Sequence, residues 1–205
     1  MLDIFILGGP VMVFIGLISI VAFAVFMYKT FHLRRAQIDT QKFMNGLANV
    51  IKKKNHIEAI TICNETPGPI SAVLRAGLLK YQKSEDQVRK AMEVASLNEI
   101  PRLEKDTPML LNIAYVAPLF GFLGTIIGLI KVFMRIQERG GIFNASDIAG
   151  GVWESLLCSA AGIVVAIPSF LAYNYLMNRA QLIVLDMERS ATELVAILFE
   201  KEEDV

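Results

Sequence analysis

The stretch GVWESLLCSAAGIVVAIPSFLAYN, residues 151–174, is apolar over most of its length and yet contains one carboxylate, Glu154. A helix of about 20 such residues is long enough to cross the hydrocarbon core of a bilayer. A charged side chain at that depth costs about 2.5–3.5 kcal/mol on insertion scales unless it is paired, protonated or in contact with water. The segment therefore predicts a membrane-spanning helix in which one acidic group has a specific role.

The composition of the whole chain also indicates a membrane protein. Of its 205 residues, 54% are hydrophobic, and the mean hydropathy is +0.49, which is too apolar for a typical soluble domain of this size. The 20 basic and 20 acidic side chains give zero formal charge, so nothing indicates nucleic-acid binding. The two histidines and two cysteines form no metal-ligand motif, and we expect neither a metal nor another cofactor.

Three uncharged or nearly uncharged runs are long enough to span a bilayer. Fourteen of the 20 Lys and Arg residues lie between the first and second runs, so the positive-inside rule predicts that this region and the C-terminus are cytoplasmic and that the N-terminus lies outside. We predict an all-α membrane protein with a first transmembrane helix at 4–28, a large cytoplasmic helical insertion at 29–106, a second transmembrane helix at 107–134, an outer loop at 135–147, a third transmembrane helix at 148–178 and a C-terminal cytoplasmic helix at 179–205.

The long region between the first two spans has the pattern of several helices. Apolar residues recur at helix-like intervals in RRAQIDTQKFMNGLANVIKKKNHIEAITICNE, and the run TPGPIS interrupts that pattern with two prolines and a glycine. Ser84 and Gln87 have the spacing of a capping box at the start of a further helix. No strand pattern competes with this interpretation.

Three polar side chains fall at membrane depth in the second and third predicted spans. With about 1.5 Å of rise per residue, Thr125 lies about 26 Å and Ser159 about 28 Å from the inner ends of their helices, so the two hydroxyls could share one level. Glu154 lies about 7–8 Å further out and about 140° around the helix from Ser159. Each hydroxyl could simply bond to the backbone one turn back. Glu154 could form an ion pair with Lys131 or Arg135, lie at the outer water interface, or face an internal cavity as a functional carboxylate.

Small residues are dense around these polar positions. Gly124 and Gly128 form a G-x-x-x-G pair, which permits close contact between helices. Small residues in membrane spans usually serve such packing. We therefore expect helix packing at five positions, namely Gly121, Gly124, Gly128, Ala161 and Gly162.

The runs PGPISAVLRAGL, LEKDTPMLLNIAYVAPLFGFLGTIIGLIKVF and VWESLLCSAAGIVVAIPSFLAYNYL resemble the ExbB/TolQ branch of the MotA/TolQ/ExbB proton-channel family. The resemblance covers nearly the whole chain and includes the order of the spans. It implies that Thr125, Glu154 and Ser159 line a proton pathway, with Ser159 standing where the family usually has threonine. Trp153 and Cys158 depart from the family's GIAEAL and TATGL patterns.

The resemblance also implies a function and partners. The family belongs to the bacterial inner membrane, with the outer loop and N-terminus in the periplasm, and uses proton flow to do mechanical work on a periplasmic or outer-membrane effector of the TonB/TolA type. Several copies, a pentamer in the family, form a homo-oligomeric ring in the lipid bilayer. A dimer of a single-span partner of the ExbD/TolR type occupies the pore and supplies the proton-carrying aspartate.

Two other functions remain open from the residues alone. A self-contained channel or transporter would conduct without a partner, whereas a structural membrane scaffold would use Glu154 only as an assembly contact. We do not expect an enzyme, because the sequence shows no nucleophile–base pair, phosphate loop or metal motif.

Overall fold

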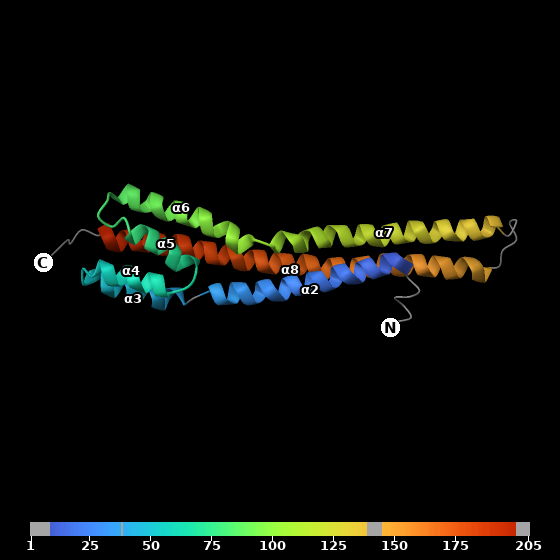
Figure 1. Ribbon diagram of the computed structural model, residues 1–205, viewed down its shortest axis with the longest axis horizontal. Coiled ribbons are helices and arrows are strands. Elements are labelled where there is room, and N and C mark those ends of the chain that lie inside the picture. Colours follow the sequence, from blue (N-terminus) through green and yellow to red (C-terminus); the bar gives the residue numbers. More distant parts are fainter. Residues whose placement is uncertain (1–8, 38, 139–144, 200–205) are drawn as a thin grey trace. The chain divides into compact units, whose positions relative to one another are not determined.

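The computed structural model describes residues 9–37, 39–138 and 145–199, in which the chain forms seven α-helices and no strand (Figure 1). The helices are α2 (Gly9–Ala36), α3 (Thr40–Lys52), α4 (His56–Glu65), α5 (Pro69–Leu78), α6 (Glu85–Glu104), α7 (Thr107–Glu138) and α8 (Ala145–Phe199). They belong to two compact units: a first unit of Met1–Lys29 with Asp106–Tyr175, and a second unit of Thr30–Lys105 with Leu176–Val205. The prediction of an all-α protein is confirmed.

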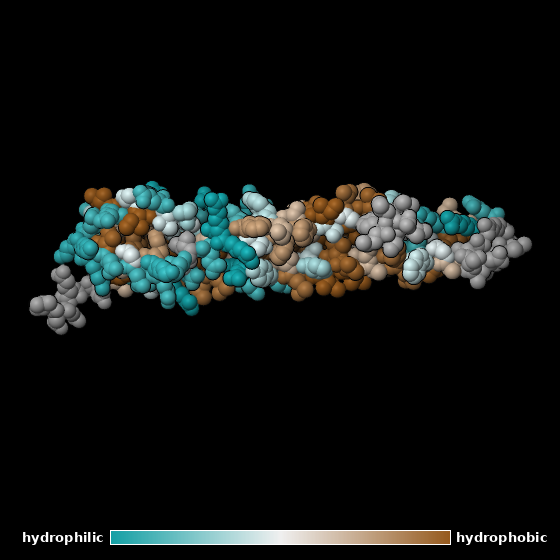
Figure 2. All heavy atoms as spheres, turned by 90° about the horizontal axis from the view of Figure 1, so that it is seen from below, coloured by the Kyte–Doolittle hydropathy of each residue, from teal (hydrophilic) through white to brown (hydrophobic). Residues whose placement is uncertain are grey.

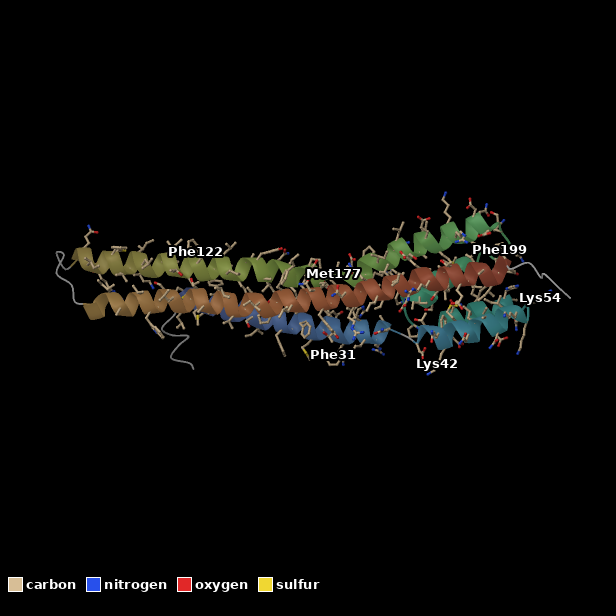
Figure 3. All side chains as sticks on the ribbon, turned by 180° about the vertical axis from the view of Figure 1, so that it is seen from behind. Phe31, Lys42, Lys54, Phe122, Met177 and Phe199 are labelled. Atoms are coloured by element: carbon tan, nitrogen blue, oxygen red, sulfur yellow. The ribbon has the colours of Figure 1, made fainter. Side chains whose placement is uncertain are left out.

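The first unit contains the apolar stretches of α2, α7 and α8, which are long and apolar enough to cross a membrane, as predicted. Its outward side chains are large and apolar: Phe23 is 67% exposed, Phe122 61% and Leu171 63%. Figure 3 shows Phe122 pointing away from α8, and Figure 2 colours much of the surface of this unit brown. Since exposed apolar patches of this extent are rare in soluble monomers, this surface suits contact with lipid or with other membrane helices.

The helices of the first unit extend beyond the predicted spans. α2 continues past 28 to Ala36, and α8 continues past 178 to Phe199 without interruption. Residues 4–8, 139–144 and 200–205 of the predicted segments lie outside the described residues. Helix ends do not mark the limits of a bilayer, so the predicted boundaries of the spans and of the insertion stay predictions.

The second unit packs α3, α4, α5 and α6 with the C-terminal part of α8 around an apolar core. The most fully buried side chains come from all five helices: Leu47, Ala59, Leu74, Val88, Met187 and Leu194. The predicted interruption at TPGPIS separates α4 from α5, where Gly68 has a φ of 142° that favours glycine. The hydroxyl of Ser71 closes this turn by donating to the carbonyls of Thr66 and Gly68 at 2.6 and 2.8 Å.

The capping box predicted at the start of α6 is wrong in its side-chain part. Ser84 is the N-cap residue, but its hydroxyl makes no capping hydrogen bond. The N–H of Gln87 instead donates to the Ser84 carbonyl at 2.9 Å. The backbone alone closes this turn, so the pattern located the helix start correctly and its chemistry incorrectly.

Neither Cys63 nor Cys158 forms a disulfide bond, and both are buried. Cys63 lies on α4 in the core of the second unit, where burial raises the pKa of its thiol to about 11 against a smaller lowering by the charge of Arg75. Only the thiolate reacts with alkylating agents, so a raised pKa makes this thiol inert at neutral pH.

We expect Cys63 to be alkylated slowly in the folded protein. In a Cys158→Ala background at pH 8, iodoacetamide should react about a hundredfold more slowly with folded than with unfolded protein, because folding lowers the thiolate fraction and buries the sulfur. The rate for folded protein should rise with pH up to about 11, the pKa of the thiol. Equal rates before and after unfolding, measured by mass spectrometry of the Cys63 peptide, would contradict the burial described here.

Candidate functional site

Helices α7 and α8 touch through their backbones in the first unit. A Cβ atom added to Gly162 of α8 would lie 2.6 Å from the carbonyl oxygen of Ala117, and one added to Gly121 of α7 would lie 2.9 Å from the carbonyl oxygen of Cys158. Gly124 likewise faces Cys158, with 2.7 Å to its Cβ atom. Because no real Cβ atom fits at such distances from backbone, glycine is required for this contact.

The remaining positions predicted for packing divide between two environments. Gly128 faces Ser155 of α8, and so continues the α7–α8 contact by one more turn. Ala161 lines an apolar groove between α2 and α8 together with Met12, Ile15 and Val164. Four of the five small residues therefore lie in the contact between α7 and α8, and Ala161 lies beside α2.

Thr125 of α7 and Ser159 of α8 are joined by a hydrogen bond between their hydroxyls. Both hydroxyls also reach the carbonyl oxygen of Gly121, Thr125 at 3.2 Å and Ser159 at 3.3 Å. Thr125 Oγ1 lies a further 3.2 Å from the carbonyl oxygen of Ser155. The depth calculation placed these hydroxyls at one level, and the structure brings them into direct contact. We call Thr125, Ser159 and the carbonyls of Gly121 and Ser155 the hydroxyl cluster.

The hydroxyl cluster has more acceptors than donors. Each hydroxyl supplies one O–H and two lone pairs, whereas each carbonyl oxygen only accepts. The four oxygen atoms have eight lone pairs for two hydroxyl protons and two helix N–H donors, and Thr125 and Ser159 are only half-buried. The cluster can accept a further hydrogen bond from a donor that approaches its open side.

Ser155 is a part of this site that the sequence reasoning missed. It is buried, its hydroxyl donates to the Gly151 carbonyl at 2.8 Å, and its carbonyl accepts from Thr125. The available signal was its spacing of four residues from Ser159, which places both serines on one face of a helix. A residue that contributes through its backbone carbonyl leaves no mark in side-chain chemistry, which explains why the pattern did not identify it.

Glu154 is not bonded to the hydroxyl cluster in the part of the chain that the structure describes. Its Oε1 lies 3.3 Å from Nζ of Lys131 on α7, and the side chains of Lys131 and Glu154 are 45% and 26% exposed. Of the alternatives left open by the sequence, the structure shows the ion pair with Lys131. The three predicted pathway residues thus form two groups, a hydroxyl pair and, further along α8 toward its N-terminus, a charge pair.

Nothing in residues 9–37, 39–138 and 145–199 resembles a metal centre, because no group of three His, Cys, Asp or Glu side chains comes together there. Between α7 and α8, which are candidates for crossing a membrane, the described contacts include hydroxyl and carbonyl hydrogen bonds and the ion pair of Lys131 with Glu154.

Comparison with known proteins agrees with this description. Residues 65–189 match the MotA/TolQ/ExbB proton channel family, and the chain belongs to this family, in its ExbB/TolQ branch. It is 25% identical to the biopolymer transport protein ExbB of Neisseria meningitidis over 95% of this chain and 96% of the relative. It is 35% identical to the Tol-Pal system protein TolQ of Haemophilus influenzae over 53% of this chain and 47% of the relative.

A further relative is the biopolymer transport protein ExbB homolog of Methanothermobacter thermautotrophicus, which is 25% identical over 87% of this chain. The chain spans only 63% of the length of that relative. The resemblance drawn from the sequence motifs is confirmed at the level of the family and of its ExbB/TolQ branch.

We expect the α7–α8 contact to have no room for even one added methyl group. Gly162→Ala should destabilise the protein by about 1–3 kcal/mol, because its Cβ atom meets the backbone of Ala117 and no rotamer change can relieve the clash. Gly150→Ala on the same helix is the matched control, since a Cβ atom there has nothing within 4 Å and a helix favours alanine over glycine by up to about 1 kcal/mol. Thermal unfolding in detergent measures both, and equal midpoints would refute the contact.

Proposed function

We propose that this chain is the ring-forming subunit of a proton-driven motor in the bacterial inner membrane, and that Thr125, Ser159 and Glu154 line its proton pathway. The observation that carries the proposal is the hydroxyl cluster, which lies between two candidate membrane helices and has unused acceptor capacity. Membership of the MotA/TolQ/ExbB proton channel family supports the same function.

The chemistry of hydroxyl groups suits a proton pathway. A hydroxyl can accept a hydrogen bond from a proton-carrying group on one side and donate to a carbonyl on the other, so it can stabilise such a group without a net charge of its own. In an apolar surrounding this matters, because a fixed charge at membrane depth is costly and a hydroxyl is not. Gly121 makes the arrangement possible, since its carbonyl accepts from both hydroxyls.

The proton carrier itself is proposed to come from a partner. Glu154 is the only Asp or Glu in 107–134 and 148–178, and 4–28 has none. Because Glu154 is paired with Lys131, it is poorly suited to carry protons alone. We infer that a dimer of an ExbD/TolR-like single-span subunit occupies the centre of a ring of this chain, a pentamer in the family, and presents its aspartate to the hydroxyl cluster.

Orientation and coupling follow from the same proposal. The N-terminus would be periplasmic, and the second unit, which carries most of the basic residues, would lie in the cytoplasm. The mechanical output would act on a TonB/TolA-like effector in the periplasm or outer membrane. The names of two relatives, a biopolymer transport protein and a Tol-Pal system protein, are consistent with such work.

Proton uptake into liposomes under a membrane potential tests the proposal. Uptake should require both this chain and an ExbD/TolR-like single-span partner, and should stop when the partner's membrane aspartate becomes asparagine. Thr125→Val keeps the shape but removes the hydroxyl, and should lower uptake about tenfold, in line with the 1–3 kcal/mol cost of an unsatisfied polar group. Thr125→Ser should retain most of the uptake, and Thr192→Val, at an exposed hydroxyl of the second unit that donates only to the Glu188 carbonyl, is the control.

Each contrary result supports another function. Uptake by this chain alone would indicate a self-contained channel. Unchanged proton uptake in Thr125→Val would show that the hydroxyl cluster is not part of the proton pathway. If Glu154→Gln altered assembly in native gels but left proton uptake unchanged, the ion pair would be an assembly contact of the kind that a scaffold uses.

A further inference from the structure

The ion pair between Lys131 and Glu154 is isolated within two otherwise uncharged stretches. Lys131 is the only charged residue in 107–134, and Glu154 is the only one in 148–178. Their 3.3 Å separation is longer than the roughly 2.7–2.9 Å of a tight charge-assisted hydrogen bond. The contact is therefore an ion pair without a short hydrogen bond.

The backbone on both sides of the ion pair is held in place. Gly128 of α7 faces Ser155 of α8, and Val132 of α7 faces Gly151 of α8, so close interhelical contacts precede and follow Lys131 along α7. Helices this close cannot separate without losing their packing. Lysine, by contrast, has a flexible four-carbon side chain. The part that can move at this level is the side chain of Lys131.

Without Lys131, Glu154 would attract cations in general. The carboxylate is 26% exposed, so it can be reached from outside the helix pair. The next residue along α8, Ser155, supplies a carbonyl to the hydroxyl cluster, so further oxygen atoms lie close along the same helix. Carboxylate, carbonyl and hydroxyl oxygens are the groups that replace the hydration shell of metal cations in proteins.

We propose that Lys131 is a tethered counter-ion that excludes Na⁺ and K⁺ from Glu154 and thereby makes the pathway selective for protons. A free cation that binds the carboxylate loses translational freedom and must displace an ammonium group that is already attached to the same protein. In the proposed function the partner's aspartate carries the protons, so their passage does not require Lys131 to leave Glu154. Lys131 is thus a specificity-determining residue, and this inference rests on the proposed function.

The test measures proton and sodium uptake in parallel, in liposomes that contain the full chain with its single-span partner. Wild type should take up protons, with sodium uptake no greater than in protein-free vesicles. Lys131→Met should raise sodium uptake about tenfold or more above that background, because the tethered competitor is gone. Lys131→Arg should behave as wild type. Arg135→Met, at an exposed basic residue one turn further along α7, is the matched control and should also exclude sodium.

A double variant separates selectivity from structure. Lys131→Met combined with Glu154→Gln should return sodium uptake to background, because the bare carboxylate is then absent. Sodium uptake that persists in this double variant overturns the inference, as does sodium exclusion by a Lys131→Met protein that still conducts protons. Lys131→Gln makes the same prediction as Lys131→Met, so poor folding of one variant does not prevent a decision. If wild type with its partner takes up no protons, the proposed function fails as well, and that result is distinct from a failure of selectivity alone.

Discussion

The backbone contact between α7 and α8 is the constraint on which the rest of the first unit depends. Lipid tails are as apolar as leucine, so helices in a membrane are not driven together by the hydrophobic effect and need close packing and hydrogen bonds instead. Gly121 and Gly162 provide the packing. The same proximity allows Thr125 and Ser159 to share an acceptor, so the contact that holds the helices together also assembles the polar site.

The sequence predicted the depth of the site residues along their helices but not the direction in which each helix faces. The rise of a helix is nearly constant, so counting residues from the inner ends of the spans was enough to place Thr125 and Ser159 at one level. The choice between Lys131 and Arg135 as the partner of Glu154 depends on how α7 and α8 are rotated about their axes. The spacing of residues within one helix gives no information about how that helix is rotated relative to its neighbour. This rotation is set by the glycine contacts between the two helices, which only the structure shows.

The sequence predicted those parts of the fold that follow from long apolar runs or from turn-forming residues. Long apolar runs identified α2, α7 and α8, and the turn chemistry of TPGPIS separated α4 from α5. The capping box at Ser84 failed because an available hydroxyl is not obliged to form the capping bond when the backbone closes the turn. The sequence predicted a C-terminal helix that continues the third span, and α8 runs past 178 without a break, with Pro168 accommodated inside the same helix.

The glycine contacts also bear on how this sequence can change over evolutionary time. The three atoms nearest to a Cβ atom added at Gly77, in the core of the second unit, belong to the side chains of Met92 and Leu194, so a larger residue there can be compensated by a smaller one at Met92. Gly162 faces backbone atoms of Ala117 and Gly121, and no substitution elsewhere can shrink a backbone. The core of the second unit can therefore change during evolution by paired substitutions that keep its total side-chain volume. At Gly162 no second substitution can compensate for a larger residue, so we expect glycine to be retained there.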